Sequence, residues 1–564
     1  MKGGLEARDS RLERRSSQSL FPSLLLSLPA LLFFALFFVW PLIEIGRVSF
    51  TPSEISRGET PLTVFGDPQY LQVLLFTLWQ ATLSTLLTLA LGLPAAYVFA
   101  RYRFAGQRLF RALAMVPFVM PTVVVAAAFS ALLGPRGALN TALQSLFRLS
   151  QPPLALTGTF SIILIAHAFY NVAVVMRLVG GFLESFNPRI EEAAANLGAN
   201  RRQTFWHVTL PMALPAIGAA AALTFLFTFT SFGVVLILGG ARFATLEVEI
   251  YRQTAQMLRL DIATSLAILQ MIVTVLVSWV STRLEQCATA PLEAQAASDL
   301  RKPPATLGAK GLVAGSLCMI VVLLMLPLFT LFLRSINFEG DPLRYYVALN
   351  ENPRGAFFFV PPLAAIRNSL LFALVTATLS MGLGLPLAYA IARGKLTLLE
   401  ALLLLPIGTS AVTLGLGFLV AFDQPPLELR TSVILLPVAH TLIALPFVVR
   451  SILPAIRAFD SRLREAARGL GANAWQVLSH VDLPLLAAPF IGAAIFAFTI
   501  SLGEFGASLL VARPEYPTMP VVIYRFLGQP GAANYGQALA MSSLLMIVTA
   551  LSVLLIERMN KRVL

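Results

Sequence analysis

Long apolar segments constrain this chain more than any other feature of its sequence. Phe21–Gly46 is apolar almost throughout, and comparable runs recur up to the C-terminus. Hydrophobic residues make up 57% of the 564 positions and charged residues only 12%, which leaves more apolar surface than a water-soluble fold can bury. Because a chain in lipid must satisfy its own backbone hydrogen bonds, runs of about 20 apolar residues favour helices. We therefore predict an all-α, polytopic membrane protein.

The apolar runs predict about twelve transmembrane helices, six in each half of the chain. They cover residues 21–46, 71–100, 111–133, 158–182, 212–239, 261–282, 311–334, 367–392, 399–422, 431–455, 485–512 and 537–556. The region between the sixth and seventh runs mixes Ala, Pro, Glu and Lys without apolar periodicity, which is typical of a linker. The expected organisation is a tail at 1–20, a first half at 21–285, a linker at 286–310 and a second half at 311–564.

Basic residues predict the sidedness of these helices. Arginines gather in the N-terminal tail, in the loop 101–111 and around 189–202, and Lys/Arg-rich loops stay in the cytoplasm. Both termini and the linker are therefore expected in the cytoplasm. Glu247 and Glu249 are expected in an external loop, where solvated charges are favoured over contact with an incoming partner. The net charge of +13 is explained by loops beside anionic lipid, so no nucleic-acid partner is expected.

A polar, helix-forming segment occurs twice between apolar runs. Glu191–Pro211 has the sequence EEAAANLGANRRQTFWHVTLP, and Arg464–Pro484 has REAARGLGANAWQVLSHVDLP. Gly198 and Gly471 mark the shared offset of 273 positions. An interfacial loop that only turns the chain would not need to be repeated, so we favour a short surface helix that docks a partner.

The duplication extends into the apolar runs. LGLPAAYVFAR at Leu91–Arg101 matches LGLPLAYAIAR at Leu383–Arg393. With an even number of spans in each half, the two repeats are parallel and face each other around an axis along the membrane normal. Their interface is the expected place for a passage.

Catalytic and metal-binding signatures are weak. The four histidines form two repeat-equivalent pairs, for which structural hydrogen bonding is favoured over a metal site or a proton relay: His167 with His440, and His207 with His480. Cys287 and Cys318 lack metal-ligand spacing and are too few for a disulfide framework. The chain has no Gly-x-x-x-x-Gly-Lys-Ser/Thr loop with which to bind ATP. We expect no catalytic residue, no metal and no cofactor bound by this chain.

Four residues within the spans are candidates for a substrate path. Glu504 lies in the sequence TISLGEFG, and Ser231 occupies the equivalent position of the first repeat. A carboxylate within a span either lines a passage, where it would meet a cationic solute, or forms a structural pair. Tyr170 and Asn171 either contact a solute or make helix–helix hydrogen bonds.

The repeated segments also suggest how a partner is held. Glu192 and Glu465 lie near helix starts, where a carboxylate favours the free amides. Phe205, Trp206 and Trp475 supply apolar anchors. A helix seated in a moving partner would pass that motion to the adjoining spans.

At these residues the chain resembles the membrane subunit of ABC importers that work with a binding protein. The positions that match the coupling motif of that family are Glu192, Ala193, Ala194, Gly198, Leu210 and Pro211, and Glu465, Ala466, Ala467, Gly471, Leu483 and Pro484. The resemblance implies a MetI-like permease fold in the bacterial inner membrane. It also implies a partner ATPase homodimer that binds ATP and Mg, and an external, periplasmic solute-binding protein.

Two copies of the motif in one chain are similar to fused permeases of the thiamine and ferric-iron branches. The segment Phe229–Tyr251 looks closer to thiamine permeases, so thiamine or a related cation is favoured and ferric iron is the alternative. An ion-coupled secondary transporter and a membrane-embedded enzyme are the alternatives of other classes. The first would need intramembrane carboxylates or broken helices arranged for coupling ions, for which Glu504 alone is thin support, and the second a convergent set of catalytic groups.

Overall fold

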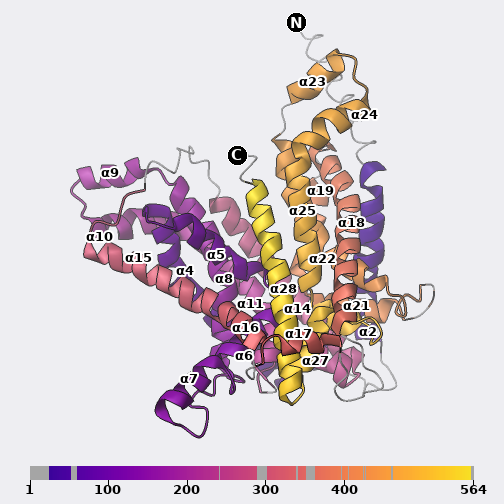
Figure 1. Ribbon diagram of the computed structural model, residues 1–564. Coiled ribbons are helices and arrows are strands. Elements are labelled where there is room, and N and C mark those ends of the chain that lie inside the picture. Colours follow the sequence, from indigo (N-terminus) through magenta and orange to yellow (C-terminus); the bar gives the residue numbers. More distant parts are fainter. Residues whose placement is uncertain are drawn as a thin grey trace. The chain divides into compact units, whose positions relative to one another are not determined.

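In the computed structural model of the chain, helices account for every named element (Figure 1). The structure describes residues 25–51, 60–240, 242–288, 301–337, 341–350, 362–394, 397–403, 405–423, 425, 427–458 and 461–560. Within these ranges the only strand-like feature is an isolated backbone bridge between Tyr102 and Lys302. The predicted all-α class is confirmed.

The described residues form a series of helices and helical turns. In chain order they are η1 (Ala35–Val39), α2 (Trp40–Phe50), α3 (Pro61–Gly66), α4 (Pro68–Arg101), α5 (Gln107–Val119), α6 (Thr122–Leu133), α7 (Ala138–Phe147), α8 (Phe160–Ser185), α9 (Pro188–Asn196), α10 (Arg201–Thr204), η2 (Phe205–Thr209), α11 (Leu210–Phe229), α12 (Gly233–Leu238), α13 (Leu246–Tyr251), η3 (Arg252–Gln256), α14 (Leu260–Ala288), α15 (Leu307–Met319), η4 (Ile320–Met325), α16 (Leu326–Asn337), α17 (Arg344–Val347), η6 (Ala348–Asn350), α18 (Pro362–Gly394), α19 (Thr397–Leu402), α20 (Leu405–Gly408), α21 (Ala411–Ala421), α22 (Leu435–Arg457), α23 (Ser461–Gly469), α24 (Ala474–Val477), η7 (Leu478–Asp482), α25 (Leu483–Gly503), α26 (Gly506–Val511), α27 (Met519–Gly528) and α28 (Ala532–Asn560).

Eleven helical segments in the described part of the chain are long and apolar enough to cross a membrane. They are Leu25–Phe50, Pro68–Arg101, Thr122–Phe147, Phe160–Ser185, Arg202–Phe229, Leu260–Leu284, Leu307–Asn337, Pro362–Ala392, Leu435–Arg457, Trp475–Gly503 and Ala532–Ile556. The predicted spans 111–133, 212–239 and 485–512 each run across a break between two helices, and 399–422 forms the short helices α19, α20 and α21. Pro406 interrupts the helix here, and Ser410 starts α21 by accepting the amide of Val412 at 3.0 Å.

The chain divides into two compact units, each assembled from separate stretches of sequence. One unit contains residues 1–48, 350–522 and 547–564, and the other contains residues 49–349 and 523–546. Neither unit coincides with the predicted sequence halves, 21–285 and 311–564. The halves describe the duplicated sequence, and their bounds stay a prediction.

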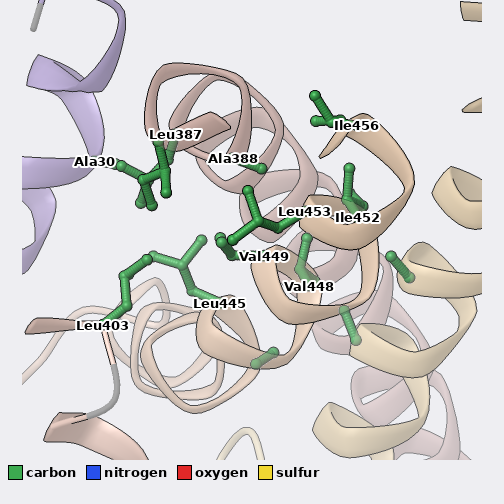
Figure 2. Packing of buried hydrophobic residues seen from close by; sticks show 14 of the residues in the cluster. Ala30, Leu387, Ala388, Leu403, Leu445, Val448, Val449, Ile452, Leu453 and Ile456 are labelled. Carbon is green, nitrogen blue, oxygen red and sulfur yellow. The ribbon is translucent and has the colours of Figure 1, made fainter. Parts of the chain in front are cut away.

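In the first unit, the N-terminal helix packs against spans from the second half of the sequence. Phe34 and Phe38 share a buried cluster with Phe418. A Cβ atom placed on Gly417 would lie 3.0 Å from the Cβ of Pro41, so the absence of a side chain on this glycine allows α2 and α21 to approach closely. Figure 2 shows the neighbouring cluster, in which Ala30 joins apolar side chains of α18 and α22.

In the second unit, the helix after the linker packs with spans from the first half of the sequence. The segment α15 contacts α4, and α16 contacts α6. Each unit thus contains the first helix of one sequence half together with later helices of the other. Packing of this kind depends on contacts between distant residues, which the periodicity of single helices does not specify.

Both units contain the same broken helix. After α11 ends, the chain turns and α12 begins at Gly233, and after α25 ends, α26 begins at Gly506. The amide of Leu246 donates to Thr77 Oγ1 at 3.0 Å, and the equivalent amide of Met519 donates to Ser369 Oγ at 2.8 Å. The duplication seen in the sequence is therefore present in the local structure.

Candidate functional site

The first repeated segment folds as α9, a tight turn, α10 and η2. Gly198 has φ of 89°, a left-handed conformation that side chains other than glycine rarely adopt. Its amide donates to the carbonyl of Ala195 at 3.0 Å, and the amide of Ala199 donates to the carbonyl of Ala194 at 3.0 Å. These bonds close the C-terminal end of α9 with a glycine cap.

The second repeated segment has the same backbone. Gly471 also has φ of 89°. Its amide donates to the carbonyl of Arg468 at 2.9 Å, and the amide of Ala472 donates to the carbonyl of Ala467 at 3.0 Å. A Cβ atom on Gly471 would have no neighbour within 4 Å, and the same is true of Gly198. Conformation, and not lack of space, therefore requires glycine at both positions.

An asparagine after each glycine starts the next helix. In the first segment, Asn200 and Gln203 exchange backbone-to-side-chain hydrogen bonds of 2.9 Å in both directions. In the second segment, Asn473 and Gln476 make the same two bonds, also at 2.9 Å. Each pair is a capping box. The sequence signal for these caps is Asn-x-x-Gln, which is present in both copies.

The turn between the two helices exposes a leucine in each segment. Leu197 is 89% exposed and Leu470 is 90% exposed. The predicted anchors Phe205, Trp206 and Trp475 are exposed as well. We call residues 188–209, which carry Leu197, Phe205 and Trp206, the first coupling loop. We call residues 461–482, which carry Leu470 and Trp475, the second coupling loop. Exposed apolar side chains of this size indicate a surface that a partner covers.

The motif residues take matching positions in the two coupling loops. The exposed members are Glu192, Ala193, Gly198 and Pro211 in the first loop region, and Glu465, Ala466, Gly471 and Pro484 in the second. The half-buried members are Ala194, Leu210, Ala467 and Leu483. The exposed alanine and glycine give each loop a solvent-facing surface with small side chains, and the other members are partly covered.

A cluster of three side chains, the first clasp, fixes the first coupling loop to its unit. The Arg101 guanidinium at the end of α4 lies 2.5 Å from Glu191 Oε1 on α9. Thr209 Oγ1, directly before α11, donates to the same oxygen at 2.8 Å. These contacts join α9 to the end of α4 and to the start of α11.

The second coupling loop is fixed by a second clasp with reversed charges. Arg464 Nε on α23 donates to Asp482 Oδ1 at 2.8 Å. Tyr389 on α18 donates to Asp482 Oδ2 at 2.7 Å, and its ring lies 5.6 Å from the Arg464 guanidinium. Position 464 is the repeat equivalent of Glu191, and position 482 is the equivalent of Thr209. The carboxylate therefore sits on the loop helix in one copy and before the span in the other.

Buried histidines tie the broken helices to neighbouring spans. His167 Nδ1 lies 2.9 Å from Ser84 Oγ, and its Nε2 lies 2.8 Å from Ser231 Oγ. Asn171 donates to the carbonyl of His167 at 2.9 Å. The hydroxyl of Tyr170 is buried and has no hydrogen-bond partner among the described residues. These polar groups lie within the first repeat, and their role in a substrate path stays a prediction.

Glu504 lies in the corresponding centre of the second repeat. His440 Nε2 is 3.3 Å from Glu504 Oε2 and 2.9 Å from Ser508 Oγ. The carboxylate accepts the amide of Ala507 at 3.0 Å and that of Ser508 at 2.9 Å. Glu504 therefore caps the start of α26 and pairs with a histidine. The oxygens of Glu504 thus bond to groups of the protein itself. The sequence left open whether Glu504 forms a structural pair, and in this conformation its charge partner is a histidine.

The prediction that Glu247 and Glu249 are solvated is wrong. They are only 0% and 4% exposed, because α13 packs against α14 inside the unit. Glu247 accepts a hydrogen bond from Gln270, and Glu249 accepts one from Gln253 at 2.7 Å. Glu249 also lies 3.3 Å from Arg252. Among the described residues, no group of three or more His, Cys, Asp and Glu side chains is placed to hold a metal ion.

Comparisons with known proteins show the family of the chain. The family described as binding-protein-dependent transport system inner membrane component matches residues 88–287, which include the first coupling loop. The sulfate transport system permease protein CysT of Salmonella typhimurium is 33% identical over 226 residues, which cover 40% of this chain and 78% of that protein. The chain belongs to this family.

Two relatives match most of the length of this chain. The thiamine transport system permease protein ThiP of Escherichia coli is 26% identical over 479 residues, which are 83% of this chain and 85% of that protein. The ferric transport system permease protein FbpB of Actinobacillus pleuropneumoniae is 24% identical over 545 residues, which are 93% of this chain and 76% of that protein. The chain is a multi-pass, fused permease of an ABC importer.

Proposed function

We propose that this permease carries thiamine, delivered by an external binding protein, into the cell with energy from a separate ATPase homodimer. The support for thiamine is a match that is extensive and that reaches 26% to 27% identity, above the 24% of the ferric permease FbpB. ThiP proteins of three genera align with 82% to 89% of this chain, whereas the sulfate permeases align with 40%. Relatives that span both repeats are the better guide to a passage formed by both.

The single observation that carries the coupling mechanism is the identical backbone of the two coupling loops. Gly198 and Gly471 have the same φ, and each loop has the same asparagine–glutamine cap. Two equivalent docking helices suit two equivalent subunits, which an ATPase homodimer supplies. Each helix enters a groove on one subunit, and its clasp passes the subunit's movement to two spans.

The proposed sidedness follows from the position of the loops. An ATPase works where ATP is present, so both coupling loops lie in the cytoplasm. The arginines near the first loop and at the end of α4 agree with this placement. Both chain termini then lie in the cytoplasm of a bacterial inner membrane.

Transport by the reconstituted complex tests the proposal. The permease, its ATPase and its binding protein are placed in proteoliposomes with ATP on the coupling-loop side, and uptake of labelled thiamine is measured. We expect uptake that requires ATP and the binding protein. Uptake of ferric iron in place of thiamine would assign the ferric substrate, which the 93% coverage by FbpB makes the second candidate.

A control separates this function from ion-coupled transport. The permease alone is reconstituted with a proton or sodium gradient and without ATPase. We expect no accumulation of thiamine or iron above the level of empty vesicles. Gradient-driven accumulation by the permease alone would contradict an ATP-driven importer.

A further inference from the structure

A cavity lies between α7 and the end of α16 in the unit that contains the first coupling loop. Its volume is about 1120 Å³, and we call it the α7–α16 cavity. Its walls include Arg136 and Arg334, and no carboxylate is among the described residues that line it. Thr141, Gln144 and Asn337 add polar groups that can donate hydrogen bonds.

The two arginines give the cavity a local positive charge. Arg136 and Arg334 come from different segments of the chain and line the same cavity. Guanidinium groups bind phosphate oxygens through paired, charge-assisted hydrogen bonds. The chemistry that fits this cavity is therefore a phosphate group.

The cavity lies at the membrane face opposite the first coupling loop. The backbone bridge between Tyr102 and Lys302 holds the chain just before α15 beside the end of α4, where Arg101 binds Glu191. From there the helical segment of 31 residues that ends at Asn337 rises about 46 Å, enough to cross a bilayer. In Figure 1, α7 and α9 accordingly lie at opposite ends of this unit.

An apolar surface leads along α16 to the cavity. Leu326, Phe329 and Leu333 are exposed and spaced three and four residues apart, so they share one face of the helix. Leu333 also lines the cavity. In a membrane protein such a face lies against acyl chains, and here it ends where the arginines begin.

Helix α7 strengthens the case for lipid over a soluble partner. Leu146 and Phe147, at its C-terminal end, are exposed apolar side chains. A short helix with apolar side chains of this kind is suited to the boundary between headgroups and acyl chains. The cavity is therefore placed where phospholipid phosphates lie.

We propose that the α7–α16 cavity binds the phosphate of an anionic phospholipid in the leaflet opposite the coupling loops. Arg136 and Arg334 bind the phosphate, and one acyl chain lies along Leu326, Phe329 and Leu333. The lipid thereby joins α7 to α16, two helices that are distant in sequence. The lipid site itself depends only on the fold and not on the transported solute. Its assignment to the external leaflet rests on the proposed sidedness.

Native mass spectrometry of the delipidated permease tests this site with phosphatidylglycerol as the probe. We expect Arg334→Gln and Arg136→Gln each to weaken phosphatidylglycerol binding about tenfold, as the loss of one charge-assisted contact predicts. Arg136 is exposed, so its replacement leaves folding intact even if that of Arg334 does not. The matched control is Arg148→Gln, which removes the same charge at the end of α7 but outside the cavity and should change binding less than twofold.

Two further probes separate lipid from other sources of negative charge. Inorganic phosphate at millimolar concentration should compete poorly, because it lacks the acyl chain that α16 contacts. Equal loss of phosphatidylglycerol binding in Arg136→Gln and Arg148→Gln, or none in either cavity variant, would overturn the proposal. Unchanged lipid binding with weaker capture of the external binding protein would instead identify a protein-docking site. None of these readouts depends on thiamine transport.

Discussion

The two coupling loops share a backbone and differ in what holds them. Both use a left-handed glycine and an asparagine–glutamine cap, with equal φ values of 89°. The first clasp places its carboxylate, Glu191, on the loop helix, and the second places it at Asp482, before the span. The comparison shows that both copies keep one loop backbone, whereas the side chains that join the loop to the membrane helices differ.

Burial also distinguishes the clasps. The Asp482 and Arg464 side chains are 2% and 14% exposed, while those of Glu191 and Arg101 are 28% and 16% exposed. Water therefore screens the Glu191–Arg101 pair of the first clasp more than the Asp482–Arg464 pair of the second clasp. The second clasp should therefore contribute more to stability, and the two should respond differently to equivalent changes.

The largest expected effect is at Asp482. Asp482→Asn removes the negative charge that faces the half-buried Arg464, and breaking a buried pair in this way costs about 3–5 kcal/mol. Chemical unfolding of the purified permease in detergent measures this loss. The exchange Arg464→Asp with Asp482→Arg restores both charges and should recover most of it. A loss below about 1 kcal/mol for Asp482→Asn would remove the distinction between the clasps.

A smaller effect is expected at Glu191. Glu191→Gln weakens the contacts with Arg101 and Thr209, and partial exposure limits the loss of unfolding free energy to about 1–2 kcal/mol. The same unfolding measurement applies. A loss equal to that of Asp482→Asn would show that burial does not rank the two clasps.

The glycine caps should respond alike in both loops. Gly198→Ala and Gly471→Ala each force a side chain into the left-handed region, at about 1–2 kcal/mol. We expect both to weaken binding of the ATPase subunit by similar factors, while insertion into the membrane is unchanged. Binding is measured by titration of the detergent-solubilised permease with ATPase. A defect in only one variant would break the equivalence of the two docking helices.

The smallest effect on stability is expected at the exposed leucines. Leu197→Ser and Leu470→Ser should leave unfolding unchanged and weaken ATPase binding about fivefold each, since an apolar anchor contributes about 1 kcal/mol or more. Leu149→Ser is the matched control, because Leu149 is also exposed but follows α7 at the opposite end of the unit. Normal ATPase binding in both loop variants would show that the leucines lie outside the interface.

Periodicity and duplication predicted much of this molecule from sequence. Apolar runs located the spans because helix formation in lipid depends on local composition, and Gly198 and Gly471 marked the turns because their conformation is a local property. The shortening of 399–422 was missed, since its overall hydropathy hides the break at Pro406. The burial of Glu247 and the reversed clasps could not be predicted, because they depend on Gln270 and on partners far along the chain.

Crosslinking at both coupling loops tests the central claim most directly. Cysteines replace Leu197 and Leu470 one at a time, in a chain with Cys287→Ser and Cys318→Ser, and are crosslinked to the ATPase in membrane vesicles. We predict that each position crosslinks to the ATPase, with two ATPase subunits bound to one permease, and that neither reacts with a membrane-impermeant reagent added outside the cell. Labelling of either cysteine from outside, or crosslinking at one position only, would contradict an importer driven through two equivalent cytoplasmic loops.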